Sequence, residues 1–154
     1  MRLILQRVLR AAVDVGSERV GEIGPGLLVL AGIERGDGSA EVERAAAKIR
    51  HLRIFEDDSG KMNLDVAQAD GGVLLVSQFT LLASTDRGRR PSFERAAPPE
   101  VAEPLVAALA AALGAFGLEV ATGRFGAHMQ VSLVNDGPVT IDLDLPPDID
   151  GRET

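Results

Sequence analysis

Two continuous apolar runs constrain the fold of this chain more than any other feature of its sequence. They are residues 27–33, Leu-Leu-Val-Leu-Ala-Gly-Ile, and residues 72–76, Gly-Val-Leu-Leu-Val. A turn signal, Gly24-Pro25-Gly26, precedes the first run. Neither run approaches the ~20 apolar residues that a membrane span needs. Both runs therefore predict short, buried strands at the centre of a sheet.

The rest of the pattern supplies further strands and two helices. Alternation over residues 3–15 predicts one or two strands. Helical spacing predicts a helix over residues 39–50 that Ser39 caps, and an Ala- and Leu-rich helix over residues 100–115. We expect the middle of the second helix to be buried, and Pro104 to lie in its first turn. The other predicted strands are residues 52–56, 71–82, 119–122, 130–134 and 139–143.

Strands outnumber helices in this pattern, and most connections are too short for parallel crossovers. The sequence therefore predicts an α+β fold, with a largely antiparallel β-sheet curled into a barrel-like core and two flanking helices. This single domain would cover residues 1–145. Residues 146–154, which begin Pro-Pro and are rich in Asp, are predicted to be a disordered acidic tail.

The composition excludes several classes of function. The chain has no cysteine, so neither disulfides nor thiolate chemistry is available. It shows no signal-peptide pattern and no membrane span. The turn Asp57-Asp58-Ser59-Gly60 has a metal-like composition but lacks the ligand spacing of a calcium loop. We therefore expect a cytoplasmic protein with no cofactor, no metal and no membrane partner.

The charge is unevenly distributed. A formal net charge of −7 argues against extensive binding to a nucleic-acid duplex, including DNA. Between residues 87 and 95, however, Arg87, Arg89, Arg90 and Arg95 stand against Glu94 alone. This segment is either a solvated loop or a small basic face for an RNA end.

Two polar motifs mark the candidate site. Ser-Gln-Phe-Thr-Leu at residues 77–81 follows the second apolar run, and Asn-Asp-Gly-Pro-Val-Thr occupies residues 135–140 between two predicted strands. On a regular strand Gln78 and Thr80 would point to one side, and Ser77 and Phe79 to the other. Both pairs can serve one site only if the strand ends near this point. The sequence thus indicates a site built from strand-end residues and main chain.

Individual side chains leave alternatives open. Thr80 could be a nucleophile or an ordinary strand residue, and no base can be nominated for it. His51 suits a surface position at a helix end. Phe79 and Phe125 could be core residues or a base-stacking surface, because the chain has no Trp or Tyr.

Both motifs, in this order and with their flanking segments, resemble the D-aminoacyl-tRNA deacylase family. The flanking matches are residues 6–8, 24–28, 52–57, 60–63, 88–93 and 122–126, and the resemblance extends over about residues 1–145. It implies an editing enzyme that cleaves the ester of D-aminoacyl-tRNA, and of glycyl-tRNA mischarged on tRNA-Ala. The partners it implies are the tRNA 3′ end carrying a D-amino acid or glycine, and a second copy in a homodimer.

The resemblance also assigns roles to residues. It implies a catalytic site at Ser77, Gln78, Phe79 and Thr80. Phe79 would lie against the terminal adenine, with Phe125 and Met129 lining the pocket. It further implies a cis bond between Gly137 and Pro138, which would enter the partner subunit's site and reject L-residues.

The family commonly has an acidic residue at the position of His128, which argues against His128 as a catalyst. The observations also allow a non-catalytic RNA-end or nucleotide-binding module that uses residues 87–95 and Phe79. A third possibility is a hydrolase of free D-aminoacyl esters or peptides, with Thr80 as nucleophile.

Overall fold

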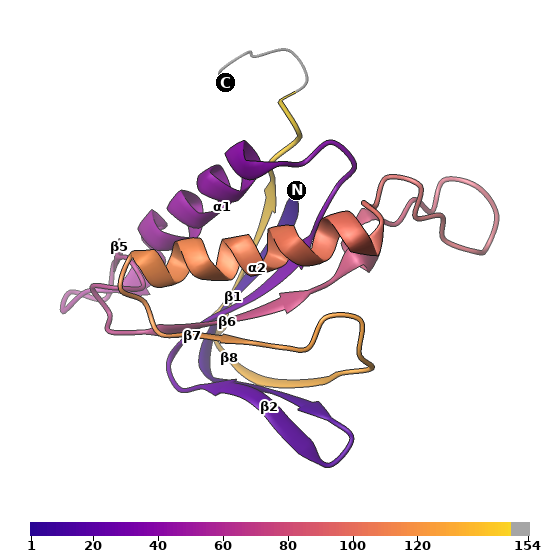
Figure 1. The fold of residues 1–154 in the computed structure, drawn as a ribbon. Helices are drawn as coiled ribbons and strands as arrows, with labels where there is room; N and C mark the ends of the chain where they lie inside the picture. The colour runs from indigo at the N-terminus through magenta and orange to yellow at the C-terminus, as the bar shows by residue number, and fades with distance from the viewer. Residues whose placement is uncertain (149–154) are drawn as a thin grey trace.

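The computed structural model describes residues 1–148 and builds them around one six-stranded sheet with two helices on the same side (Figure 1). The strands of this sheet are β1 (Arg2–Val15), β2 (Glu18–Ile23), β3 (Gly26–Gly32), β6 (Gly72–Ser77), β7 (Val120–Thr122) and β8 (Gln130–Asp144). The helices are α1 (Ser39–His51) and α2 (Pro99–Ala115), with a short 3₁₀ helix η1 (Phe79–Leu82). A separate two-stranded hairpin consists of β4 (Phe55–Glu56) and β5 (Met62–Leu64).

The two apolar runs are confirmed as the neighbouring central strands β3 and β6. Alternate residues of β3 enter two different hydrophobic clusters. Leu27 and Val29 pack in the cluster that includes α1 and α2, whereas Leu28 packs on the opposite face with residues of β1, β2 and β6. A sheet buried on both faces needs apolar side chains at successive positions, which explains the continuous runs.

The sheet is mixed, so the prediction of a largely antiparallel sheet was only partly right. β1 is antiparallel to β2, β3 and β8, but β3–β6 and β6–β7 are parallel pairs. The connections from β3 to β6 and from β6 to β7 are both long, and each contains a helix, as parallel crossovers require. The strand predicted over residues 52–56 shrinks to β4, which lies outside the main sheet.

Three predictions about the helices were wrong. The N-cap of α1 is Gly38, not Ser39, and the Glu41 carboxylate accepts a hydrogen bond from the Gly38 N–H at 2.8 Å. Helix α2 begins at Pro99, so Pro104 lies beyond its first turn. The middle of α2 is only half buried. Leu109 and Leu113 face the core, while the alanines of its outer face, Ala107, Ala108 and Ala111, are exposed.

Two strand boundaries also differ from the prediction, and both concern the motifs. The strand predicted to reach residue 82 stops at Ser77, where η1 follows after one residue. The two strands predicted at residues 130–134 and 139–143 are one continuous strand, β8. Its register against β1 jumps from Val8 opposite Asn135 to Gln6 opposite Thr140. Residues 136–139 therefore bulge out of β8 opposite Arg7.

Most of the predicted disordered tail, residues 149–154, lies outside the described residues. The described start of that segment is anchored. The Asp148 N–H donates to the Glu41 carboxylate at 3.0 Å, and the N–H of Leu145, the residue before the segment, donates to the Met1 carbonyl at 2.8 Å. Within residues 1–148, neither helix is both long and apolar enough to cross a membrane.

Candidate functional site

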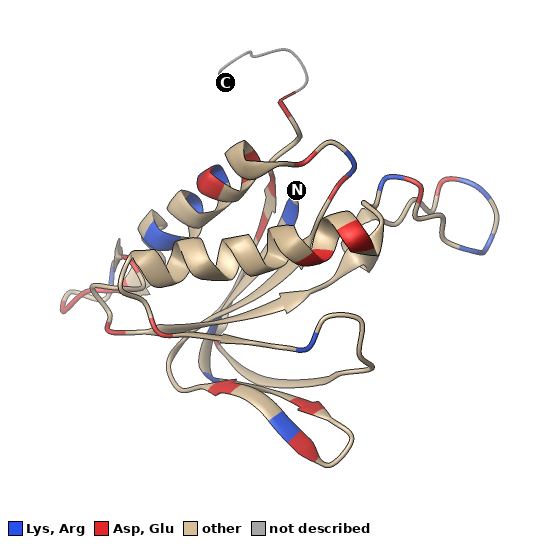
Figure 2. Cartoon of the chain, viewed as in Figure 1, with Lys and Arg blue, Asp and Glu red and all other residues tan. Residues whose placement is uncertain are grey.

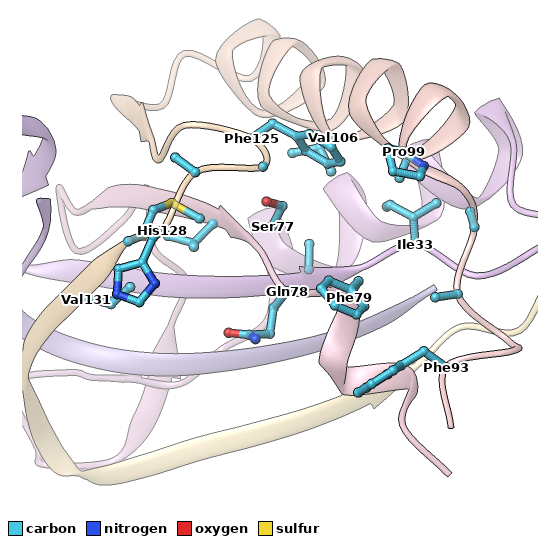
Figure 3. A pocket seen from close by; sticks show the side chains of 18 residues that line it. Ile33, Ser77, Gln78, Phe79, Phe93, Pro99, Val106, Phe125, His128 and Val131 are labelled. Atoms are coloured by element: carbon cyan, nitrogen blue, oxygen red, sulfur yellow. The ribbon is translucent and has the colours of Figure 1, made fainter. Parts of the chain in front are cut away.

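A pocket of about 550 Å³ opens where β6 ends, beside the first turns of α2 and the loop that precedes β8 (Figure 3). Its walls are mainly apolar. Ile33 and Val106 close the side beneath α2, and Val131 lies on the side of β8. A hollow of this size falls in the range of about 300–1,000 Å³ that small-molecule sites occupy.

The sharp end of β6 gives this pocket its chemical character. The Gln78 N–H still donates to the Ala31 carbonyl at 2.7 Å, and the chain then turns into the 3₁₀ helix η1. The first N–H groups of any helix lack partners within it. Among the described residues, no hydrogen-bond acceptor is found for the N–H groups of Phe79 and Thr80. Two adjacent free donors of this kind can stabilise a negatively charged oxygen.

The structure brings most of the predicted site residues together at this pocket. The lining includes five of them, namely Ser77, Gln78, Phe79, Phe125 and Met129. Thr80 does not line the pocket, and its hydroxyl oxygen accepts a hydrogen bond from the Gln78 side-chain amide. Because β6 stops at Ser77, consecutive residues no longer alternate between opposite faces of a strand.

Three phenylalanines, Phe79, Phe93 and Phe125, line the pocket. Phe79 is 57% exposed, so its interpretation as a core residue is wrong. It meets Phe93 edge to face, with ring centroids 5.1 Å apart. Phe125 lies on the α2 side of the pocket, near Val106 (Figure 3). The sequence did not predict Phe93 as a pocket residue, although it lies within the arginine-rich segment of residues 87–95.

Acid–base groups are scarce here. Of the residues that line the pocket in the described chain, only His128 is ionisable, and it is exposed. No hydrogen bond joins His128 to Ser77 or Thr80 within residues 1–148. The same residues contain no group of three or more His, Cys, Asp or Glu side chains that could hold a metal ion. The Asp57 carboxylate instead accepts from the Ser59 and Lys61 N–H groups of its own turn, at 2.8 and 3.1 Å.

The second motif forms a rigid tip elsewhere on the chain. We use "tip" for residues 136–139. The buried Arg7 side chain donates to the Asp136 carbonyl at 2.8 Å and to the Ile54 carbonyl at 2.7 Å. The Asn135 side chain pairs with the Val139 main chain, accepting from its N–H at 2.8 Å and donating to its carbonyl at 3.1 Å. These contacts hold both ends of the tip.

The tip itself consists mainly of exposed backbone. The bond between Gly137 and Pro138 is cis, and both residues are exposed. Gly137 has φ +153°, and a Cβ placed there would lie 2.7 Å from the Val139 nitrogen. Neither Gly137 nor Pro138 lines the pocket of its own chain. A single copy therefore keeps the two motifs apart.

Comparisons with known proteins agree over nearly the whole chain. The family model described as "D-Tyr-tRNA(Tyr) deacylase" matches residues 4–144. A relative from Heliobacterium modesticaldum named "D-aminoacyl-tRNA deacylase" is 57% identical over 141 residues, which is 92% of this chain and 94% of the relative. A relative of the same name from Cronobacter sakazakii is 53% identical and is covered over its full length, against 94% of this chain.

Solved structures share the fold. One named "c-Myc DNA Unwinding Element Binding Protein" superposes with a TM-score of 0.89 at 43% identity, covering 95% of this chain and 99% of the other. A "probable eukaryotic D-amino acid tRNA deacylase" superposes with a TM-score of 0.79 over 94% of this chain and 98% of the other. Its identity of 18% makes it a likeness of fold alone.

Proposed function

The chain belongs to the D-Tyr-tRNA(Tyr) deacylase family, and from this premise we propose that it is an enzyme that hydrolyses the ester joining a D-amino acid to the 3′ end of tRNA. One observation carries the proposal to this site. The end of β6 leaves the N–H groups of Phe79 and Thr80 without partners among the described residues, next to an aromatic-lined pocket. An enzyme with this substrate would work in the cytoplasm.

The terminal adenosine of the tRNA is the group that we assign to the pocket. Its base would stack on Phe79, and Phe125 and Met129 would line the cavity around it. Stacking on aromatic rings suits any base, because every base has a π-face. The aminoacyl ester would then lie at the strand end, near Gln78 and Thr80.

The proposed reaction is direct attack by water. The water oxygen bonds to the ester carbonyl carbon, and the carbonyl oxygen takes up negative charge that the N–H groups of Phe79 and Thr80 stabilise. The bond to the ribose oxygen then breaks. One proton of the water ends on that ribose oxygen, and the vicinal ribose hydroxyl assists the transfer. Gln78 and Thr80 position the ester. In this reaction no side chain acts as a base.

Selection against L-amino acids is assigned to the tip of a second copy. In this proposal the protein is a homodimer, and Gly137 and Pro138 of each subunit enter the pocket of the other. Two-fold symmetry makes such an exchange occur twice. The backbone wall collides with the Cβ of an L-residue and admits a D-residue, whose side chain points outward. Glycine has no Cβ and is therefore also cleaved.

Single-turnover rates on three substrates test this proposal. We expect rapid hydrolysis of D-alanyl-tRNA and glycyl-tRNA, and intact L-alanyl-tRNA. If glycyl-tRNA is cleaved no faster than L-alanyl-tRNA, selection is not steric exclusion. If all three stay intact, the hydrolase assignment fails. Capture of a covalent acyl group on Thr80 would replace water attack with nucleophilic catalysis.

A mixing experiment tests the shared site. A Phe79→Ala copy has a damaged pocket and an intact tip, whereas a Gly137→Ala copy has the reverse. In a heterodimer of the two, one of the two composite sites is intact. Equal mixing after reassembly should therefore restore about a quarter of wild-type activity. The absence of recovery would refute the exchange. So would a protein that is monomeric by light scattering and still discriminates fully between D- and L-alanyl-tRNA.

A further inference from the structure

The chain between Ser84 and Ser92 forms a closed loop directly before Phe93, a residue that lines the pocket. The Ser84 N–H donates to the Ser92 carbonyl at 2.8 Å, and the Ser92 N–H donates to the Ser84 carbonyl at 2.9 Å. This pair of bonds fixes the base of the loop, and residues 85–91 project from the body of the molecule (Figure 1). Phe93, the next residue after the base, lines the pocket and contacts Phe79.

The loop carries cations that are not neutralised internally. Arg87, Arg89 and Arg90 are all exposed, and within residues 1–148 none of them forms an ion pair. Figure 2 shows several blue stretches, which mark Lys or Arg, along the part of the chain that projects from the body of the molecule. Arg95 differs from these three, because its guanidinium lies 2.9 Å from the Glu34 carboxylate. The loop's one acid, Asp86, accepts a hydrogen bond from the Ser84 hydroxyl.

The three exposed arginines make the local charge at this loop positive, opposite to the net charge of the chain. The chain as a whole carries a formal net charge of −7, so a repelled RNA backbone needs a local site of opposite charge. Exposed arginines are suited to this role, because a guanidinium donates to phosphate in a planar fork. Single-stranded nucleic acids are commonly held by stacking aromatics beside a basic track for the backbone.

We propose that Arg87, Arg89 and Arg90 bind the phosphates of the RNA strand that leads to the terminal nucleotide in the pocket. The inference rests on the proposed function and extends it from the nucleoside to the polynucleotide. The loop supplies affinity and orientation for tRNA, and makes no contact with the ester. Removal of the loop arginines should therefore lower the efficiency of cleavage of aminoacyl-tRNA and leave the cleavage of a short aminoacyl nucleoside unaffected.

A matched pair of double variants tests this assignment. Arg89→Gln/Arg90→Gln removes two loop cations. Arg44→Gln/Lys48→Gln removes two cations from α1, and neither of these residues lines the pocket. Each variant is assayed on D-tyrosyl-tRNA and on 3′-O-D-tyrosyl adenosine, which contains the ester and the nucleoside but no phosphate.

On D-tyrosyl-tRNA the loop variant should lose about tenfold or more in kcat/KM. The slope of log kcat/KM against log salt concentration should become less steep by about 1.4, which corresponds to two single-strand phosphates. On the phosphate-free ester it should match wild type, and the α1 variant should match wild type on both substrates. Equal salt slopes for the two variants, or an equal loss on the phosphate-free ester, would overturn the proposal.

The result also separates this inference from the proposed function. If the wild-type protein cleaves neither substrate, the hydrolase assignment fails. The proposed phosphate contacts of the loop can then still be tested by equilibrium binding of uncharged tRNA, with the same two variants and the same salt series. A shallower slope for the loop variant alone supports the phosphate contacts, and identical slopes refute them.

Discussion

The tip at residues 136–139 and the pocket at the end of β6 are built on opposite principles. The tip is fastened at both ends, by two hydrogen bonds from Arg7 and Asn135 to its carbonyls and one more that Asn135 accepts. The pocket is mainly apolar, with Phe79 largely exposed, and two main-chain N–H groups at its edge lack partners among the described residues. Backbone that is anchored at both ends suits a wall, and free donors suit a reacting group.

Arg7 explains why the tip can be rigid although it consists of exposed residues. Its guanidinium is buried, and a buried cation is costly unless it is paired and hydrogen-bonded. The carbonyls of Asp136 and Ile54 supply the hydrogen bonds, and the carboxylates of Asp136 and Glu56 lie 3.7 and 4.0 Å away. One side chain of β1 therefore ties β4 to the bulge of β8.

The largest effect is expected for Gly137→Ala, which disturbs the tip and leaves the pocket unchanged. The new Cβ would lie 2.7 Å from the Val139 nitrogen at a φ of +153°, so the tip backbone must move. A displacement of about 1 Å in a positioning element can cost about 100-fold in rate. We expect a loss of this size on D-alanyl-tRNA, and a rise in L-alanyl-tRNA cleavage relative to it.

Gly60→Ala is the matched control for that variant. Gly60 also has a positive φ, +77°, but no atom lies within 4 Å of the added Cβ. It should show a small loss of stability and unchanged selectivity. Equal D-to-L rate ratios for the two variants would mean that the tip does not select chirality.

Arg7→Lys should have the next largest effect. Lysine keeps the charge but loses the planar fork that reaches two carbonyls at once. Leaving a buried acceptor unsatisfied costs about 1–3 kcal/mol, so we expect the free energy of unfolding in urea to fall by about 2 kcal/mol. The D-to-L rate ratio should fall with it, because the tip loses its anchor. A destabilised variant with wild-type selectivity would show that Asn135 alone fixes the tip.

The position and partners of Arg7 also show what could and could not be predicted from the sequence. Leu3, Leu5 and Arg7 share one face of β1, and the two leucines are fully buried. A charged residue, Arg7, at the third core-facing position indicates a structural role from the sequence alone. The partners of Arg7 could not be predicted, because Ile54 and Asp136 are distant from it in sequence.

The pocket shows a similar division. The apolar runs predicted β3 and β6. Of the eight residues that the family resemblance assigned to the site, five line one pocket, whereas Thr80, Gly137 and Pro138 do not. The point at which β6 ends could not be predicted, since Phe79 and Thr80 are residue types that favour a strand and so extend the predicted one. Parallel pairing was missed for another reason. It depends on which strands the long, helix-containing connections bring together, and this is a property of the whole fold.

Phe79→Ala tests the pocket side of the contrast. Removing a ring that stacks on a base typically costs about 1–3 kcal/mol. We expect kcat/KM on D-alanyl-tRNA to fall by roughly tenfold, mainly through KM, with the D-to-L ratio unchanged. Phe116→Ala is the control, since Phe116 is also exposed, at 44%, but packs against His51 away from the pocket. A change of chiral ratio in Phe79→Ala would mean that the pocket takes part in selection.

The smallest effect is expected for Thr80→Ala, and it decides whether the pocket works through its backbone as the tip does. The Thr80 hydroxyl accepts from Gln78, and its N–H is one of the two free donors at the strand end. Alanine removes the hydroxyl and keeps the N–H, so the oxyanion contact survives and turnover should fall by less than about tenfold, the cost of roughly one neutral hydrogen bond. Rapid quenching of wild-type protein with D-alanyl-tRNA, followed by mass spectrometry, should find no acyl group on Thr80. Complete loss of single-turnover activity in Thr80→Ala, together with an acyl adduct in the wild type, would make the hydroxyl a nucleophile. The free N–H groups would then assist a covalent mechanism in place of direct attack by water.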